Sequence, residues 1–213
     1  EEIQYCAFEK CSSLSSELLL PNSLKTIQES AFYCCNLQGK LILPNSLESI
    51  GAGAFQFAGH FSGDLIIPEK VTTIGQYTFW LATFTGNLVL NNSVNLGDGC
   101  FYHSGFSGEL IIPEGIIELP ENCFDGCLFS SVFFPSTLRK IGASAFSQGN
   151  LLEKIFIPEG VVSIGTAAFS SQPFINSVSL PSTLQTIGTS AFRGCYGISN
   201  ITCSAIEPPT VQS

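Results

Sequence analysis

The sequence predicts a β-rich α/β solenoid, in which short parallel strands and short helical turns repeat along the whole chain. Prolines recur every 22 to 24 residues, and a phenylalanine follows most of them by eleven residues. The prolines are Pro21, Pro44, Pro68, Pro113, Pro135, Pro158 and Pro181, with Asn91 in the one vacant place. The phenylalanines are Phe8, Phe32, Phe55, Phe79, Phe101, Phe124, Phe146, Phe169 and Phe192. About nine coils therefore fill residues 1–213 as a single solenoid, because one coil can bury its apolar residues only against its neighbours.

A run of three apolar positions ends at each proline place. The runs are 18–20, 41–43, 65–67, 88–90, 110–112, 132–134, 155–157, 178–180 and, before the tail, 201–203. They are too short for helices and rich in β-branched residues, and proline removes a donor of the strand ladder. We therefore predict one short strand in each run.

The second half of each coil carries four further regular positions. Leu47 and Ile50 illustrate the first two, which predict a second short strand. Glycine usually follows and permits a left-handed turn. The pair Ala54–Phe55 then predicts a short helical turn with the phenylalanine inward. A last apolar position leads back to the next run: Leu14, Leu37, Phe61, Phe84, Phe106, Leu128, Leu151, Phe174 and Ile198.

Three departures from the repeat predict an irregular region. Gln28 and Pro120 replace the glycine, Asn91 replaces proline, and one residue is missing before Gly97. We expect the sheet to kink near residues 91 to 100.

Composition excludes several classes of partner. Eight basic against seventeen acidic residues give a net charge of −9, which disfavours binding to nucleic acid or to an anionic membrane surface. No apolar run is long enough to span a bilayer in this segment. The chain has no initiator methionine and no signal-like leader, so we expect a mature chain or a fragment of a larger surface protein.

Nine cysteines are many for a chain of this length. Four of them, Cys11, Cys35, Cys127 and Cys195, lie three residues after the repeated phenylalanine. A buried thiol that packs as a small hydrophobe with a weak donor is the favoured interpretation. Disulfides between Cys11 and Cys35 or between Cys100 and Cys123 remain open, since each pair shares a register in adjacent coils. Zinc is a weak alternative, because Cys123 and Cys127 have no second pair at zinc-site spacing.

The sequence offers no catalytic constellation. His60 and His103 are the only histidines and occupy different registers in coils that are not adjacent. Rows of similar groups on open faces do not converge at a cleft as catalytic groups must. The turn acids Glu69, Glu114 and Glu159 are expected to be solvated charges. We therefore predict no enzyme, no cofactor and no metal site.

Strand alternation predicts a row of outward-facing apolar side chains. In each run the first and third residues point inward and the middle one points outward. The outward residues are Leu19, Ile42, Ile66, Val89, Ile111, Phe133 and Phe156, followed by Ser179 and Thr202. A contiguous apolar patch on a solvent-facing sheet commonly marks a partner surface, so these seven are the candidate partner-binding residues. The alternative is that β-branched and aromatic residues simply suit neighbouring strands there.

The repeated phrases "IPEKVTTIGQYTF" and "LPSTLQTIGTSAFRGC" resemble the BspA-type leucine-rich repeat. The resemblance covers residues 3 to about 203 and implies a right-handed leucine-rich-repeat array. It also implies a secreted or cell-surface, non-catalytic protein that serves in adhesion by binding host or neighbouring-cell proteins. It supplies no catalytic residues.

Two other functions stay open. The solenoid could be a structural spacer or stalk that presents another domain. A lesser alternative is carbohydrate binding on the turn side, where Trp80 and Tyr102 lie.

Overall fold

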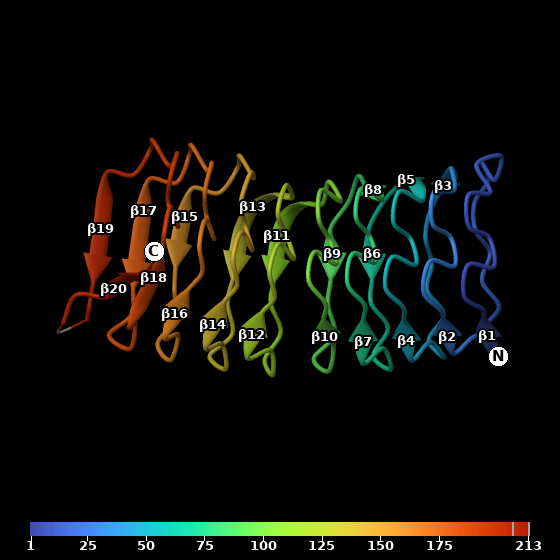
Figure 1. Cartoon of the computed structure of the whole chain (residues 1–213), viewed down its shortest axis with the longest axis horizontal. Helices are drawn as coiled ribbons and strands as arrows, with labels where there is room; N and C mark the ends of the chain where they lie inside the picture. Colours follow the sequence, from blue (N-terminus) through green and yellow to red (C-terminus); the bar gives the residue numbers. More distant parts are fainter. Residues whose placement is uncertain (206, 213) are drawn as a thin grey trace.

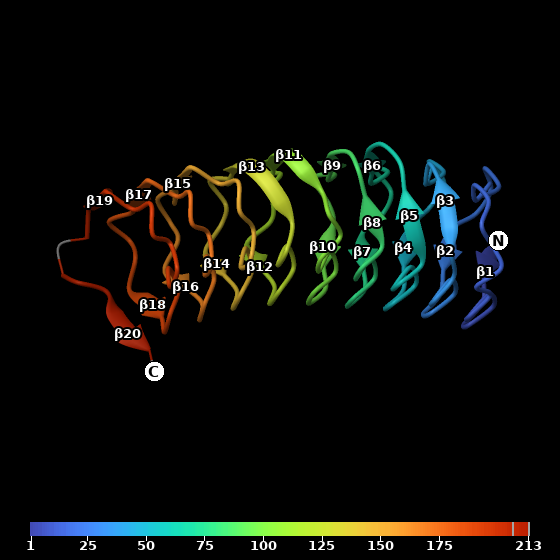
Figure 2. The same cartoon turned by 90° about the horizontal axis from the view of Figure 1, so that it is seen from above.

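The structure is a computed structural model that describes residues 1–205 and 207–212. Successive coils stack side by side in one elongated row (Figure 1). Seen from above, the row is gently arched, with the two ends of the chain at its two ends (Figure 2). All of the paired strands are parallel, and each pairs with the equivalent strand one coil away.

The first row of strands contains the isoleucine that precedes the repeated glycine. One of its two sheets contains β1 (Glu2–Ile3), β2 (Thr26–Ile27), β4 (Ser49–Ile50), β7 (Thr73–Ile74) and β10 (Asn95–Leu96). The other contains β12 (Glu118–Leu119), β14 (Lys140–Ile141), β16 (Ser163–Ile164), β18 (Thr186–Gly188) and β20 (Thr210–Gln212). Ile27, Ile50 and Ile74 pair in register and are buried, as the repeat predicts.

The second row of strands leads into the prolines. Its sheets are β6 (Leu65–Ile66) with β9 (Leu88–Val89), β11 (Ser107–Ile111) with β13 (Leu128–Phe133), and β15 (Lys154–Phe156) with β17 (Ser177–Leu180) and β19 (Asn200–Cys203). A short third sheet contains β3 (Leu37–Gly39), β5 (Gly59–Phe61) and β8 (Thr83–Phe84). Strands were also expected at 18–20 and 41–43, but neither run belongs to a sheet.

The helical turns and the α/β class expected from the sequence are wrong, because residues 1–205 and 207–212 contain no helix. Around each repeated phenylalanine, successive backbone N–H groups donate alternately to a carbonyl of the next coil and to a carbonyl of their own turn. Phe32 N donates to Ala54 O of the next coil at 2.8 Å, whereas Tyr33 N donates to Ser30 O of its own turn at 3.1 Å. A helix requires every N–H to bond within its own segment, so this alternation replaces a helix with a stack of turns.

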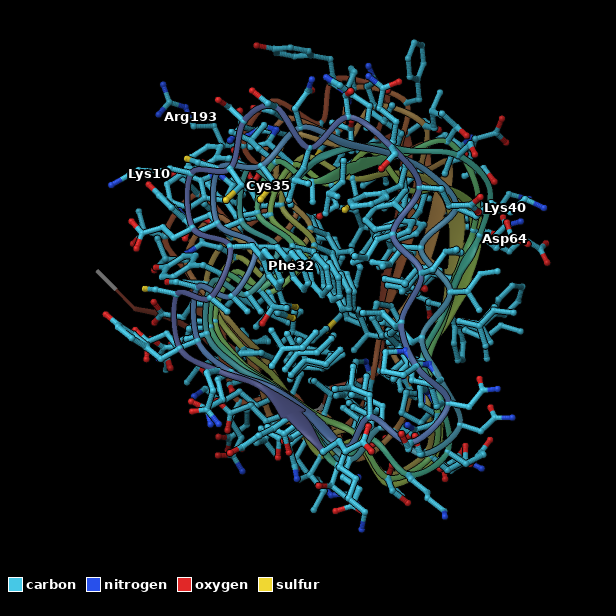
Figure 3. The ribbon with its side chains drawn as sticks, turned by 90° about the vertical axis from the view of Figure 1, so that its right-hand side faces the viewer. Lys10, Phe32, Cys35, Lys40, Asp64 and Arg193 are labelled. Carbon is cyan, nitrogen blue, oxygen red and sulfur yellow. The ribbon has the colours of Figure 1, made fainter. Side chains whose placement is uncertain are left out.

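The core is organised by the repeated phenylalanines, which form one stack from Phe8 to Phe192. Neighbouring rings lie 5.2 to 5.7 Å apart between centroids and are nearly parallel. The label on Phe32 marks this interior (Figure 3). Stacked aromatic pairs add about 0.5–1.5 kcal/mol beyond the area they bury. We refer to each coil below by its stacked phenylalanine.

In the second half of the array, the last buried apolar position of the coil lies one residue closer to the following proline than it does in the first half. Leu37, Phe61, Phe84 and Phe106 are buried as expected. In the next three coils the buried residues are instead Phe129, Leu152 and Ile175, while Leu151 and Phe174 are exposed. The shift begins at an irregularity in which Gly108 pairs with Phe129 but Glu109 pairs with Ser131, so that Ser130 is an extra residue.

The glycine that follows the repeated isoleucine allows adjacent coils to approach each other closely. It does not form the left-handed turn that the sequence predicted. Neither Gly51 nor Gly165 has a positive φ. A Cβ on Gly51 would lie 2.4 Å from Glu29 N, and a Cβ on Gly165 would lie 2.5 Å from Ala143 N. Only glycine lets the backbones of adjacent coils come this near.

The expected irregular region coincides with breaks in both strand rows. One sheet of the first row ends at β10 and the next begins at β12, and β9 and β11 belong to different sheets. In regular coils the glycine N–H continues the ladder, as when Gly142 N donates to Leu119 O at 2.8 Å. Pro120 takes this place after β12 and has no N–H, so it cannot donate the equivalent bond toward β10.

Candidate protein-binding face

The runs that lead into the prolines place the seven candidate residues on one face of the array, five of them in strands of the second row, and Leu19 and Ile42 in runs that lie outside the sheets. Because side chains alternate along a strand, the residues on either side of each candidate point inward. Leu65 and Ile67 are buried while Ile66 between them is exposed, and Leu110 and Ile112 flank exposed Ile111 in the same way. The proline, or Asn91 in its place, ends each of these runs at the same register in successive coils.

All seven side chains of this apolar row are exposed. Their exposed fractions are Leu19 83%, Ile42 66%, Ile66 60%, Val89 47%, Ile111 64%, Phe133 52% and Phe156 70%. Ile66 pairs directly with Val89, and Ile111 pairs with Phe133. The seven side chains therefore recur at one register over about 30 Å at a strand spacing of about 4.8 Å, and the strand ladder beneath them is broken between β9 and β11 and between β13 and β15.

The band is not flat. A hollow of about 540 Å³ lies at Val89, Ile111 and Phe133, where the floor includes Leu90 and Ile112. A second hollow of about 240 Å³ lies between Ile42 and Ile66. The larger one coincides with the break between β9 and β11, and Val89 is the smallest side chain of the row. Both features leave room for a side chain from outside.

Polar residues border the apolar row on the N-terminal side of each strand. Lys40 and Asp64 lie together on this side of the array, across from Lys10 and Arg193 on the turn side (Figure 3). Asp64 Oδ1 accepts hydrogen bonds from Asn87 N at 2.7 Å and Asn87 Nδ2 at 3.2 Å, which link adjacent coils.

Two of the three turn acids, Glu114 and Glu159, lie at the opposite border and are more than solvated charges. Glu114 accepts bonds from Ser136 N at 3.0 Å and Ser136 Oγ at 3.1 Å, and Glu159 binds Ser182 in the same way. These bonds lower the pKa of both carboxyl groups. The border is therefore ionised at neutral pH and is fixed in position.

The buried-thiol interpretation is confirmed for three of the four cysteines at the shared register. Cys35, Cys127 and Cys195 are buried, and each Sγ donates to the carbonyl of the stacked phenylalanine in the preceding coil at 3.1 to 3.2 Å. Ser104 uses its hydroxyl in the same place, at 2.7 Å from Phe79 O. Cys11 is exposed, and none of the nine cysteines is disulfide-bonded.

The remaining titratable groups do not assemble into a catalytic or metal centre. His60 Nδ1 lies 2.6 Å from Thr83 Oγ1, whereas His103 contacts Tyr102 in another part of the array. Within the described ranges, no three His, Cys, Asp or Glu side chains are grouped to hold a metal ion. In the same ranges, no helix has the length and apolar character needed to cross a membrane.

Comparison with known families identifies the repeat. The family model of the BspA type leucine rich repeat region matches residues 1–106 and 94–207, with six copies. The chain is a BspA-type leucine-rich repeat protein. Leucine-rich repeat proteins commonly bind other proteins across their extended sheets and act as scaffolds without catalytic groups.

A solved structure supports the architecture of this BspA-type protein. A leucine-rich repeat protein from Bacteroides ovatus is 21% identical, covers 95% of this chain and superposes with a TM-score of 0.64. The chain spans 64% of that protein's length. A leucine rich cell surface protein from Faecalibacterium prausnitzii is 19% identical, with a TM-score of 0.40 over 95% of this chain and 76% of its own. None of the curated proteins compared with the chain matches it.

Proposed function

We propose that this BspA-type protein is a secreted or cell-surface, non-catalytic adhesion module that binds a host or neighbouring-cell protein through the apolar row. The observation that carries the proposal is the exposure of seven apolar side chains at the same register of successive coils on one face of the array. An isolated exposed apolar residue is ordinary, but a contiguous band bordered by polar residues is characteristic of protein-binding surfaces. In this proposal residues 1–213 are one solenoid, either a mature chain or a piece of a larger surface protein.

Phe133 and Phe156 are the proposed anchors of the partner. Aromatic residues dominate the energetically important positions of protein interfaces. Phe133 lines the larger hollow, and Phe156 is 70% exposed one coil further on. A partner side chain in the hollow would bury both the phenylalanine ring and the smaller Val89 beside it.

The test compares two double variants of the protein. Phe133→Ser/Phe156→Ser removes the anchors from exposed positions, so it should leave stability nearly unchanged. Ile117→Ser/Phe174→Ser is the matched control, because Ile117 and Phe174 are 61% and 58% exposed but lie outside the row. Each protein is immobilised and exposed to extracellular-matrix extract and to intact cells.

The proposal predicts that the wild type and the control retain the same proteins and that the anchor variant loses them. Equal retention by the anchor variant, with its fold verified by circular dichroism, would overturn the proposal. If the wild type retains nothing, the structural spacer becomes the better description.

A further inference from the structure

A second cluster of aromatic side chains lies at the surface of the turn side and is independent of the apolar row, with Tyr77 exposed and the other rings half-buried. Its six rings belong to four consecutive coils: Tyr33, Phe57, Tyr77, Trp80, Tyr102 and His103. Trp80 is the centre, with ring centroids 5.1 Å from Phe57 and 5.5 Å from both Tyr77 and Tyr102. These ring pairs are tilted by 34° to 49° instead of being stacked like the core phenylalanines. We call this group the turn-side aromatic cluster.

The cluster retains bulky residues where the backbone disfavours them. In every coil the residues two before and two after the stacked phenylalanine have a positive φ. Most coils place Gly, Ser, Asn or another small or flexible residue there, but Phe57, Tyr77, Leu81 and His103 have φ angles of 50° to 54°. A bulky residue in this conformation is unusual and strained, and such strain concentrates at functional sites. The four residues fall in three adjacent coils on this surface.

Glycines in the next coil let two of these rings lie over the backbone. A Cβ on Gly99 would lie 2.5 Å from Tyr77 Cε1, and a Cβ on Gly126 would lie 2.1 Å from His103 Nδ1. Both rings therefore lie across the surface of the neighbouring coil. The rings form a platform on the outside of the protein and not an extension of its core.

The platform is bordered by carboxylate and amide groups. Asp125 is only 4% exposed and accepts a bond from Gln148 Nε2 at 3.1 Å. Burial raises the pKa of Asp125, and the nearby His103 opposes this rise. Gln76 Nε2 lies 3.4 Å from Asp98 Oδ2 at the side nearest Tyr77.

Charge disfavours an anionic ligand at the centre of this surface, although Lys10 Nζ lies 6.0 Å from the Tyr33 ring centroid at one end of the cluster. The turn segments 51–62, 75–86 and 97–108 contain no lysine or arginine. An uncharged ligand with apolar C–H faces and peripheral hydroxyls matches both the aromatic rings and the carboxylate and amide border of the site. The partly positive C–H groups of a pyranose ring stack on the electron-rich faces of aromatic rings. Carboxylate and amide oxygens accept bonds from its hydroxyl groups.

We propose that the turn-side aromatic cluster binds an uncharged carbohydrate, with sugar rings stacked on Trp80 and Tyr77 and hydroxyls bonded at the Asp98 and Gln76 border. Because Trp80 is the only tryptophan of the chain, its fluorescence reports on this site alone. A sugar that covers Trp80 will shift its emission to shorter wavelength and protect it from acrylamide quenching.

The test titrates the protein with soluble neutral glucan, mannan and galactan, and follows Trp80 fluorescence together with affinity electrophoresis. At least one polysaccharide should protect Trp80 and retard migration. Tyr77→Gly should weaken this binding at least about tenfold, which corresponds to 1.4 kcal/mol. The same substitution relieves the positive-φ strain but removes the ring contact with Trp80, so circular dichroism must show that the variant is folded before its binding is compared. Tyr196→Ala is the matched control, since Tyr196 is 90% exposed outside the cluster and its loss should change nothing.

Three results would overturn the proposal. They are no response to any of the three polysaccharides, equal binding by Tyr77→Gly, and competition by tetramethylammonium, which would identify a site for cations. The anchor variant Phe133→Ser/Phe156→Ser should bind the polysaccharide as the wild type does. A negative result for the carbohydrate site therefore leaves the proposal of the protein-binding row untouched, and the reverse also holds.

Discussion

Each coil holds two residues in the left-handed backbone conformation, one on each side of its stacked phenylalanine. Fourteen of these residues are not glycine, and their φ angles lie between 50° and 61°. The conformation costs roughly 1–2 kcal/mol for a residue with a Cβ. It persists because the N–H groups of the turn bond alternately within the coil and to the next one.

Ala167 permits a direct measurement of this cost. Ala167 has a φ of 55° and donates its N–H to Thr189 O at 2.9 Å, a bond that glycine can also make. Ala167→Gly should therefore raise the free energy of unfolding in urea by about 0.5–1 kcal/mol, after the larger entropy of an unfolded glycine is included. The control is Ala168→Gly, which removes a fully buried methyl group and should lower stability by about 1–2 kcal/mol. Equal losses in the two variants would contradict the strain argument.

The buried cysteines predict sensitivity to alkali. Burial raises the pKa of Cys127 to about 12 and of Cys35 to about 11, and it also raises those of Cys100 and Cys123. In the unfolded chain these thiols ionise near pH 8.5. The folded state is therefore fully favoured below about pH 8.5, and its stability falls as the pH rises toward the folded pKa values. Each thiol contributes a loss of about 1.4 kcal/mol per pH unit in this window.

The variant Cys100→Ala/Cys123→Ala/Cys127→Ser isolates the thiol contribution. Alanine is the usual residue at the register that Cys100 and Cys123 share, and Ser104 shows that a hydroxyl can replace the thiol at the register of Cys127. Urea midpoints measured in reductant at about pH 8 and about pH 10 should fall much less for the variant than for the wild type. Parallel losses would assign the alkaline effect to other groups.

At the scale of the element, Asn91 shows how one turn closes without proline. Its side chain is buried, and Nδ2 donates to Pro68 O at 2.6 Å and Val71 O at 2.9 Å in the preceding coil. Oδ1 accepts a bond from Ser93 N at 2.8 Å within the turn. The side chain thus links two coils beside the break in the strand rows.

Asn91→Ala should destabilise the protein by about 1–3 kcal/mol, since it leaves the carbonyl of buried Val71 without the Asn91 donor and Ser93 N without the Asn91 acceptor. Asn92→Ala is the control, because Asn92 is exposed and its substitution should change stability by less than about 0.5 kcal/mol. Thermal unfolding followed by circular dichroism distinguishes the two. A melting temperature for Asn91→Ala equal to that of Asn92→Ala would show that water replaces the asparagine bonds.

Sequence periodicity predicts most of the elements but not their register everywhere. The apolar row could be predicted because proline fixes where each strand ends and alternation then decides which side chain is outward. Leu128 and Phe129 are both apolar, so no pattern shows that the extra Ser130 turns Phe129 inward. The hollow at Val89 was likewise unpredictable, since it depends on a break between sheets. The aromatic cluster gave only a weak signal through Trp80 and Tyr102. Tyr33 shares their register, but the remaining rings lie at two other registers, so no single row of the repeat contains the cluster.

At the scale of the whole molecule, each coil contacts only its neighbours. The free energy of unfolding is therefore the sum of the stability of each coil and of the interaction energy at each junction between adjacent coils. Regular junctions combine strand ladders with the phenylalanine stack and the turn bonds. The junction between the Phe101 and Phe124 coils lacks the ladder between β10 and β12. It retains the turn bond from Phe101 N to Cys123 O at 3.0 Å and the ring contact at 5.7 Å. This junction is where the array should separate first.

Phe124→Ala should therefore convert one unfolding transition into two. The substitution costs about 3–5 kcal/mol at any interior coil, but here it also removes a principal contact between the two halves of the array. Phe55→Ala is the matched control, because Phe55 is equally buried and sits where the ladder between β4 and β7 is intact. It should lower the midpoint and preserve a single transition. Hydrogen exchange measured by mass spectrometry would locate the split, with residues before β10 and after β12 exchanging at different denaturant concentrations. A single cooperative loss of protection in Phe124→Ala would show that the turn bonds alone hold the two halves together.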